Sequence, residues 1–166
     1  ITIYHNNGEV GVCSRNMDLK DTGENKFWNT VNKYPVIDVL RNLGRNVALQ
    51  GELIGAGIQG NKYKLEALDI RLFNAFDIDS FARFNLNDLK YFARITSVPL
   101  VPILDEDFIL NHSMDDLVDY SEGVSMLKDT QREGVVIRSH ESIEDPDLGD
   151  LSFKVINPKF LLKHGE

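Results

Sequence analysis

Two short β-branched runs near the end of the chain each carry one charged residue among apolar neighbours. Glu133 opens the first run, residues 133–138, and Lys154 lies inside the second, residues 152–156. A strand that buries a charge without a local partner is costly, so we expect both residues to face a ligand, a metal or each other. A carboxylate and an ammonium group that line one cleft suit a metal-bound polyphosphate. The two runs therefore indicate nucleotide chemistry.

The composition of the chain restricts the functions it can have. Its 166 residues carry a formal net charge of −8, with 42% hydrophobic and 27% charged residues, as expected for one globular domain. This charge argues against binding nucleic acid by bulk attraction, although it does not exclude a local basic groove. No apolar run approaches the roughly 18 residues of a membrane span. The one cysteine, Cys13, excludes an internal disulfide and favours a reducing, cytoplasmic location.

Hydrophobic patterns and turn residues predict the elements that would position these charges. Asn7 and Gly8 mark the turn of a hairpin, and Pro35 and Gly44 mark the two ends of a helix. Further strands are expected over residues 47–53, 71–78, 133–138 and 152–156, further helices over residues 87–95 and 113–127, and a last helical turn from residue 158. Residues 98–104 predict an edge strand or an extended connection. Because the strands cluster as hairpins, we predict an α+β fold.

A glycine pattern in the middle of the chain suggests a different function that its context contradicts. Residues 55–60 match G-x-G-x-x-G after a predicted strand, with Asp77 and Asp79 about 20 residues further on. In a dinucleotide-binding unit a helix of about three turns would open here, but residues 61–69 are too few, and no second strand–helix–strand unit follows. We therefore expect a flexible loop between two antiparallel strands, with a loop that lies over a ligand as the functional alternative.

Five segments, taken in order, resemble motifs of the covalent nucleotidyltransferases, the superfamily of polynucleotide ligases and messenger-RNA capping enzymes. Residues 11–16 resemble the element just after the nucleophile. Residues 49–52, together with the glycine loop, resemble the third motif, and residues 73–78 resemble the aromatic strand that follows it. Residues 133–138 and 152–163 resemble the fourth and fifth motifs. The resemblance covers essentially all of residues 1–166 and is closest to ATP-dependent RNA ligases of the Deinococcus-type branch.

The resemblance implies an ATP-grasp-like nucleotidyltransferase domain of antiparallel sheets with peripheral helices and an ATP cleft. In such a ligase a lysine takes AMP from ATP, AMP passes to an RNA 5′-phosphate, and a 3′-hydroxyl displaces it. Each step is a displacement at phosphorus, so catalysis consists mostly of positioning and charge neutralisation with Mg²⁺ or Mn²⁺. The implied partners are RNA ends, including those of a nicked duplex or an RNA–DNA hybrid, and the implied state is a monomer.

The resemblance also implies roles for five residues. Glu133 would hold the metal and help to activate the lysine, and Lys154 would contact the α-phosphate. Arg15 would contact phosphate or the accepting strand. Glu52 would accept hydrogen bonds from ribose hydroxyls, and Phe73 would stack on adenine. For each charged residue the alternative is an ordinary solvated position on the surface.

The identity of the adenine-stacking residue stays open between two phenylalanines. Alternation along residues 71–78 places Phe73 with Ala75 and Asp77 on one face and Asn74 and Phe76 on the other. Most strand phenylalanines pack in a core. Phe73 could therefore be a core residue and exchange roles with Phe76.

Two features depart from the family pattern. The family's nucleophile belongs to a Lys-x-Asp-Gly motif, and none of the ten lysines has that context. We expect this motif upstream of Ile1, and no enzyme–AMP adduct from residues 1–166 alone. Many relatives also carry two lysines two residues apart in the last strand, whereas Lys154 has Ser152 and Ile156 at that spacing. A single lysine leaves part of the phosphate charge to another group.

Other functions are compatible with these motifs. A DNA ligase or a GTP-dependent capping enzyme would share them. A non-catalytic ligase relative that holds nucleotide or RNA would lack the nucleophile, as residues 1–166 do. The residues encoded immediately upstream of Ile1 distinguish the ligase from the binding module, because Lys-x-Asp-Gly there supports the ligase.

Overall fold

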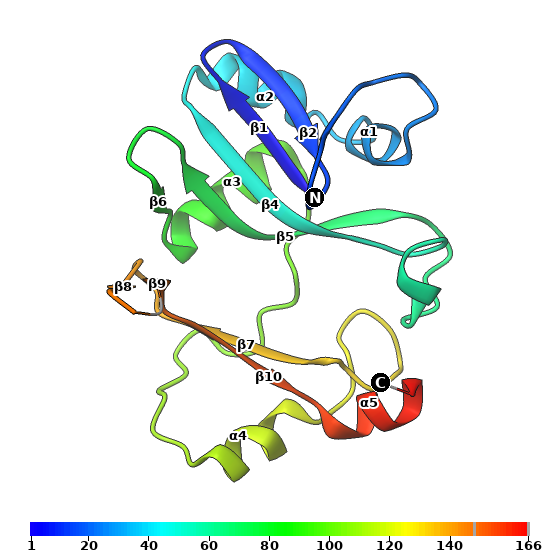
Figure 1. Cartoon of the computed structure of the whole chain (residues 1–166), viewed down its shortest axis with the longest axis vertical. Helices are drawn as coiled ribbons and strands as arrows, with labels where there is room; N and C mark the ends of the chain where they lie inside the picture. The colour runs from blue at the N-terminus through cyan, green and yellow to red at the C-terminus, as the bar shows by residue number, and fades with distance from the viewer. Residues whose placement is uncertain (148, 166) are drawn as a thin grey trace.

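The computed structural model describes residues 1–147 and 149–165, which form two layers, one above the other in Figure 1. The upper layer is a six-stranded sheet in the order β3-β2-β1-β4-β5-β6, with every neighbouring pair antiparallel. Its strands are β1 (Thr2–Asn6), β2 (Glu9–Cys13), β3 (Asp18–Leu19), β4 (Val47–Ile54), β5 (Asp69–Asp77) and β6 (Ala82–Arg83).

Three helices pack against one face of this sheet and enclose the hydrophobic core. They are α1 (Lys26–Val31), α2 (Val36–Leu43) and α3 (Leu86–Thr96). Side chains from sheet and helices are buried together there, among them Ile3, Leu49, Leu72, Leu40 and Phe92. Burial of each such side chain contributes about 1.5–3 kcal/mol, so the core holds β4 and β5 firmly in place.

Local sequence signals determine where several of these elements begin and end. Asn7 (φ 49°) and Gly8 (φ 86°) adopt the left-handed conformation that a two-residue turn between β1 and β2 requires. Pro35 precedes the first residue of α2, and Gly44 (φ 65°) ends it. The predicted hairpin and helix are confirmed.

The lower layer contains the two strands with which the sequence analysis began. β7 (Gly134–Arg138) and β10 (Ser152–Ile156) pair antiparallel, and β8 (Glu144–Asp145) pairs with β9 (Gly149–Asp150). Figure 1 shows α4 (Met114–Ser121) and α5 (Pro158–His164) below this pair. The mixture of antiparallel sheets and separate helices confirms the α+β prediction. Within the part of the chain described, none of the helices has the length and apolar character needed to cross a membrane.

Two connections between elements agree with the predictions. Residues 98–104 form an extended connection rather than a full strand, joined to β5 by one parallel bridge between Leu72 and Leu100. The glycine pattern lies in a loop between β4 and β5, where the only described helix is the short 3₁₀ turn η1 (Gln59–Asn61). Because β4 and β5 are antiparallel, this loop is not the first turn of a dinucleotide-binding unit.

The helix that begins after Ser113 is shorter than predicted. Ser113 and Asp116 form a reciprocal capping box at its start, as the sequence indicated. The helix ends at Ser121 and not at residue 127, because Gly123 (φ 139°) turns the chain. Arg132 then donates from Nε to the carbonyl oxygen of Ser121 at 2.9 Å, which satisfies a carbonyl that a longer helix would have paired internally.

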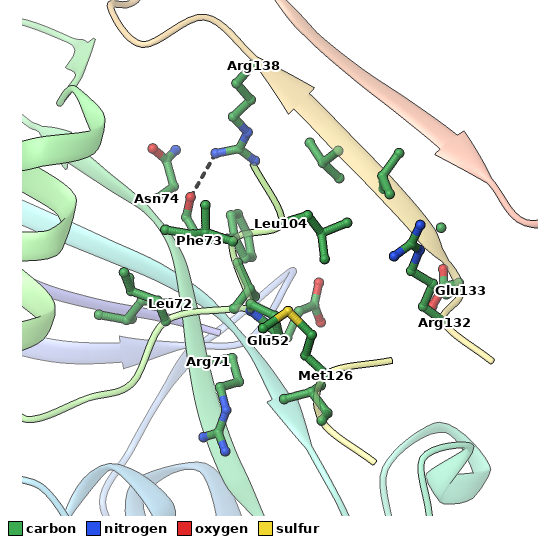
Figure 2. Close-up of a pocket in the computed structure, with 18 of the residues that line it drawn as sticks. Glu52, Arg71, Leu72, Phe73, Asn74, Leu104, Met126, Arg132, Glu133 and Arg138 are labelled. Atoms are coloured by element: carbon green, nitrogen blue, oxygen red, sulfur yellow. Dashed lines mark hydrogen bonds between the residues drawn. The ribbon is translucent and has the colours of Figure 1, made fainter. Parts of the chain in front are cut away.

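The predicted face of Phe73 is wrong, because β5 contains a β-bulge. Gly51 of β4 pairs with Leu72, while the residue before it pairs with Asn74, so Phe73 is the extra residue. Leu72 and Ala75 are both fully buried on the core side. Phe73 therefore does not share the face of Ala75, and it lies toward the lower layer instead (Figure 2).

A hydrogen-bonded cluster around Tyr34 predicts how stability changes at alkaline pH. Tyr34 donates its hydroxyl proton to Asp69, which also pairs with Arg71. Burial, the hydrogen bond to Asp69 and the negative charge of Asp69 raise the pKa of Tyr34 from 10.0 to about 12. Below pH 10 the hydroxyl is protonated in both folded and unfolded protein. As the pH rises toward about 12, the unfolded chain loses its proton first, so stability falls.

The variant Tyr34→Phe has no hydroxyl to titrate, so it should lack the part of the loss in stability that Tyr34 causes between pH 10 and about 12. Denaturant unfolding of both proteins on either side of pH 10 measures the difference. An equal loss of stability in the two proteins would contradict the assignment.

Candidate functional site

A cavity of about 660 Å³ lies between the two layers. Its lining comes from β4 and β5 of the upper sheet and from β7 and Lys154 of the lower pair. The loop between β4 and β5 and the extended connection of residues 98–104 also contribute to it. Four of the five predicted site residues line it, namely Glu52, Phe73, Glu133 and Lys154. Figure 2 shows Glu52 and Phe73 on the side of the upper sheet and Glu133 at the start of β7.

Glu133 and Lys154 point toward each other across the β7–β10 pair. Lys154 donates from Nζ to Oε1 of Glu133 at 2.7 Å. The two side chains are 43% and 54% exposed, so the pair is open to a ligand in the cavity. Strand alternation alone does not explain the meeting, because Lys154 pairs with Val136, three residues after Glu133. Glu133 lies just before β7 and reaches Lys154 from the end of that strand. The prediction that these two residues converge is confirmed.

The backbone of Glu133 is held on both sides. Its N–H donates to the hydroxyl oxygen of Tyr63 at 3.1 Å, and its carbonyl oxygen accepts from the N–H of Asn157 at 2.8 Å. Asn157 is fully buried and donates from Nδ2 to the carbonyl oxygen of Arg132 at 2.8 Å. Burial raises the pKa of Tyr63, so its hydroxyl is neutral at physiological pH. These contacts fix the position from which the carboxylate of Glu133 extends.

Phe73 is held on the opposite wall by Arg138, which reaches across from the end of β7. Nη1 of Arg138 donates to the carbonyl oxygen of Phe73 at 2.8 Å, the dashed line of Figure 2. Cζ of Arg138 lies 5.4 Å from the centroid of the Phe73 ring, a distance typical of a cation–π contact. Burial, and then the positive charge of Arg83, lower the pKa of Arg138, which nevertheless stays charged.

Phe76 lies outside the cavity and has a different partner. Its ring makes an edge contact with Phe81, with the ring centroids 6.4 Å apart, and it is absent from the described lining. Of the two phenylalanines, Phe73 is therefore the one available to a ligand in the cavity.

Arg15 is the one predicted site residue that the structure leaves apart from the others. It is exposed in the turn that follows β2, and it is not among the described residues that line the cavity. The N–H of Ser14 donates to the carbonyl oxygen of Met17 at 2.8 Å and closes this turn. The contact of Arg15 with phosphate or an accepting strand stays a prediction.

The charged residues of the cavity are mostly cationic, although the chain as a whole is acidic, with a net charge of −8. The lining contains Lys62, Arg71, Arg83, Arg132, Arg138 and Lys154, against Glu52, Asp105, Glu106 and Glu133. Clefts lined by an excess of one charge concentrate ligands of the opposite sign. Two of these cations, Arg71 and Arg83, are paired with Asp69 and Asp150, so the surroundings are nearly balanced in charge. An anionic ligand such as a polyphosphate would bind to individual cations of the cavity rather than to a general excess of positive charge.

Two residues of the site were missed by the sequence reasoning. The side chain of Arg83 is only 7% exposed and donates from Nε to Asp150 at 2.8 Å, which ties β6 to β9. Tyr63 contacts Glu133 as described above. The partners lie 67 and 70 residues away along the chain, so no local pattern marks either residue.

The donor set of the cavity fits a metal ion that arrives with a phosphate ligand. Among the described residues, no three His, Cys, Asp or Glu side chains lie close enough to hold a metal by themselves. Mg²⁺ usually binds through one or two carboxylates together with waters and substrate phosphates. Glu133 offers such a carboxylate, with only Oε1 bonded to Lys154. The same donor set does not fit a structural zinc site, which needs four protein ligands.

Comparisons with known proteins identify the family to which the chain belongs. Solved structures of Naegleria gruberi RNA ligase match 99% of this chain: one mutant with AMP and Mn and another with ATP and Mn have TM-scores of 0.89, and the ligase with PPi has 0.88, each at 36% identity. The chain covers 48% of each of those chains, so it spans about half their length. A search of curated proteins found no significant match. The family model described as RNA ligase matches residues 1–156, and the chain therefore belongs to the RNA ligase family.

Proposed function

We propose that the chain is the nucleotidyltransferase domain of an ATP-dependent RNA ligase. The intact protein would join 5′-phosphate and 3′-hydroxyl ends through enzyme–AMP and RNA–adenylate intermediates. Membership of the family supports this proposal, as do the similar ligase structures with ATP, AMP, PPi and Mn. The observation that carries it is the Glu133–Lys154 pair, which lines the same cavity as Glu52 and Phe73.

The geometry supports a role for each of the four predicted site residues that line the cavity. Phe73 stacks on adenine, and the hydrogen bond from Arg138 to its carbonyl oxygen holds it in place. Glu52 accepts hydrogen bonds from ribose hydroxyls. Lys154 contacts the α-phosphate, and Glu133 holds the metal and orients the attacking lysine. A bound Mg²⁺ or Mn²⁺ supplies neutralisation of the phosphate charge. These assignments make catalysis mainly a matter of positioning groups around phosphorus.

Arg15 has a different role in this proposal. Because it is exposed outside the cavity, it suits the accepting RNA strand better than the nucleotide. Its planar guanidinium can bind a phosphate through two parallel hydrogen bonds. The RNA partner would then be bound along the surface that leads away from the cavity, as a nicked duplex or a hybrid would require.

The nucleophilic lysine would come from residues encoded upstream of Ile1. The backbone nitrogen of Ile1 donates to the carbonyl oxygen of Gly51 at 2.9 Å, one residue before Glu52 of the cavity lining. In the antiparallel register of β1 and β4, a residue preceding Ile1 continues alongside Glu52. A Lys-x-Asp-Gly motif at that place would enter the cavity. We further propose a cytoplasmic location, which the single free cysteine supports, and a monomeric state.

The experiment that tests the function is transfer of label from ATP to the full-length protein in the presence of Mg²⁺ or Mn²⁺. We expect lysine-linked label from α-labelled ATP that is stable to alkali and labile to acid, as a phosphoramidate is, and none from γ-labelled ATP, because the adduct keeps only AMP. The competing function is a nucleotide-binding module that holds ATP without forming an adduct. Protein that binds ATP but takes no label from either form would support the module and refute the ligase.

A further inference from the structure

The glycine-rich loop between β4 and β5 is closed at its neck. Gly55 has φ 115°, and a Cβ at this position would lie 2.1 Å from the carbonyl oxygen of Ala67. Only glycine permits this approach, which brings the two ends of the loop together. The residues between them therefore form a compact projection from the upper sheet.

Hydrogen bonds inside the loop give it a defined shape. Oδ1 of Asn61 accepts from the N–H of Leu65 at 2.9 Å, and Nδ2 of Asn61 donates to the carbonyl oxygen of Leu65 at 2.8 Å. The N–H of Asn61 donates to the carbonyl oxygen of Ile58 at 2.7 Å. These bonds lie on both sides of Tyr63 along the chain and hold it within the loop.

Tyr63 connects this loop to the lower layer. Its ring lies against Phe160 of α5, with the centroids 6.1 Å apart, and Phe160 is fully buried. Nζ of Lys62 lies 5.4 Å from the centroid of the same Phe160 ring. The hydroxyl oxygen of Tyr63 accepts from the N–H of Glu133 at 3.1 Å. One residue of this loop thus contacts both Phe160 of α5 and Glu133, which immediately precedes β7.

The hydrogen bond from Glu133 to Tyr63 differs from the other bonds of Glu133. The carbonyl oxygen of Glu133 accepts a hydrogen bond from Asn157, and its carboxylate accepts one from Lys154. Both of these partners belong to the lower layer. Among the described residues, Tyr63 provides the hydrogen bond that ties Glu133 to the upper sheet, where Glu52 and Phe73 lie. The distance between the two halves of the site at this point depends on that bond.

We propose that Tyr63 is a positioning residue, which sets the carboxylate of Glu133 against the upper wall of the cavity so that it can hold a phosphate-bound metal ion. This inference rests on the proposed function. It gives the glycine-rich loop a purpose other than covering the nucleotide, because the loop presents Tyr63 to Glu133 in a fixed geometry. Loss of the hydroxyl should then act through the metal and not through the fold.

The test is Tyr63→Phe in the full-length protein, which keeps the ring against Phe160 and removes only the hydroxyl. Calorimetric titration of Mn²⁺ in the presence of AMP measures the metal without any reaction. We expect the dissociation constant of Mn²⁺ to rise about five- to tenfold, the effect of one lost hydrogen bond. The Mn²⁺ concentration for half-maximal labelling by ATP should rise by the same factor, with a rate at saturating Mn²⁺ that changes little.

A matched control is Tyr4→Phe. It removes another tyrosine hydroxyl, which donates to Asp18 at 3.3 Å away from the cavity, and it should leave both measurements unchanged. In a Glu133→Gln background, Tyr63→Phe should add no further loss, because the carboxylate it positions is gone. Equal results for Tyr63→Phe and Tyr4→Phe, or full additivity with Glu133→Gln, would overturn the inference. Failure of the wild-type protein to take label would instead refute the proposed function. The calorimetric titration of Mn²⁺ would still test whether Tyr63 positions Glu133.

Discussion

In the full-length protein, Glu133→Gln is expected to slow the transfer of AMP from ATP by about 100-fold or more. The substitution keeps the shape of the side chain and removes the charge that would hold the metal in the proposed function, so the phosphate charge in the transition state would lose part of its neutralisation. A loss of about 3 kcal/mol of transition-state stabilisation corresponds to this factor. Single-turnover labelling with α-labelled ATP at saturating Mg²⁺ measures the rate.

The same substitution should hardly change the stability of the protein. Glu133 and Lys154 are 43% and 54% exposed, and ion pairs exposed to this degree contribute about 0–1 kcal/mol to folding. The midpoint of thermal unfolding should therefore stay close to that of the wild type. A large effect on rate with a small effect on stability separates a catalytic role from a structural one.

Glu122→Gln is the matched control for this prediction. Glu122 also pairs with a lysine, Lys159, and neither residue is among the described residues that line the cavity. The control should label at nearly the wild-type rate. If Glu133→Gln labelled as fast as Glu122→Gln, Glu133 would have no part in the chemistry, and the ion pair with Lys154 would be an ordinary surface pair.

The pairing of the two runs that carry Glu133 and Lys154 was predictable from the sequence because it depends on local rules. Two short β-branched runs favour strands, and the short separation between them favours antiparallel pairing. Side chains in paired strands alternate with a period of two, which by itself would put Glu133 and Lys154 on opposite faces, since Lys154 pairs with Val136. Their contact depends on the position of Glu133 just before β7, which the pattern does not determine. The turn at Asn7 and Gly8 and the helix end at Gly44 were predictable from local rules, since each depends on the conformation of one or two residues.

The face of Phe73 could not be predicted, because it depends on a partner strand. The bulge in β5 arises from its pairing with β4, where Gly51 lies so close to β5 that a Cβ would be 2.7 Å from the carbonyl oxygen of Arg71. Nothing within residues 71–78 signals this pairing. The extra residue reverses the alternation and sends Phe73 into the cavity, next to Arg138.

The contacts that close the cavity were beyond prediction for a related reason. Tyr63 to Glu133, Arg83 to Asp150 and Arg138 to Phe73 join residues that are 70, 67 and 65 positions apart. Each depends on how the two layers pack, which hydrophobic periodicity does not determine. Sequence motifs thus identified which residues could do the chemistry, while the packing of the layers determines how far apart they are held.

Gly134→Ala is expected to destabilise the protein by about 3 kcal/mol. It should also separate Lys154 from Glu133 and so disrupt the site. Gly134 has φ 157°, and a Cβ there would lie 2.1 Å from the carbonyl oxygen of Val155 in the paired strand. Neither backbone can move freely, because Gly134 pairs with Ile156 and the next bond of the ladder joins Asn157 to Glu133. The glycine that follows Glu133 is therefore required for the close pairing that brings Lys154 to the carboxylate. Denaturant unfolding measures the stability.

Gly57→Ala separates this steric effect from the conformational cost of replacing a glycine. Gly57 also has a positive φ, 79°, but a Cβ there would meet no atom within 4 Å. It should lose only about 1–2 kcal/mol, the cost of placing alanine in the left-handed region. If the two variants were equally stable, the β7–β10 pair could relax around the added methyl group. Glu133 and Lys154 would then not need the spacing that the glycine provides, and Gly134→Ala should label at close to the wild-type rate.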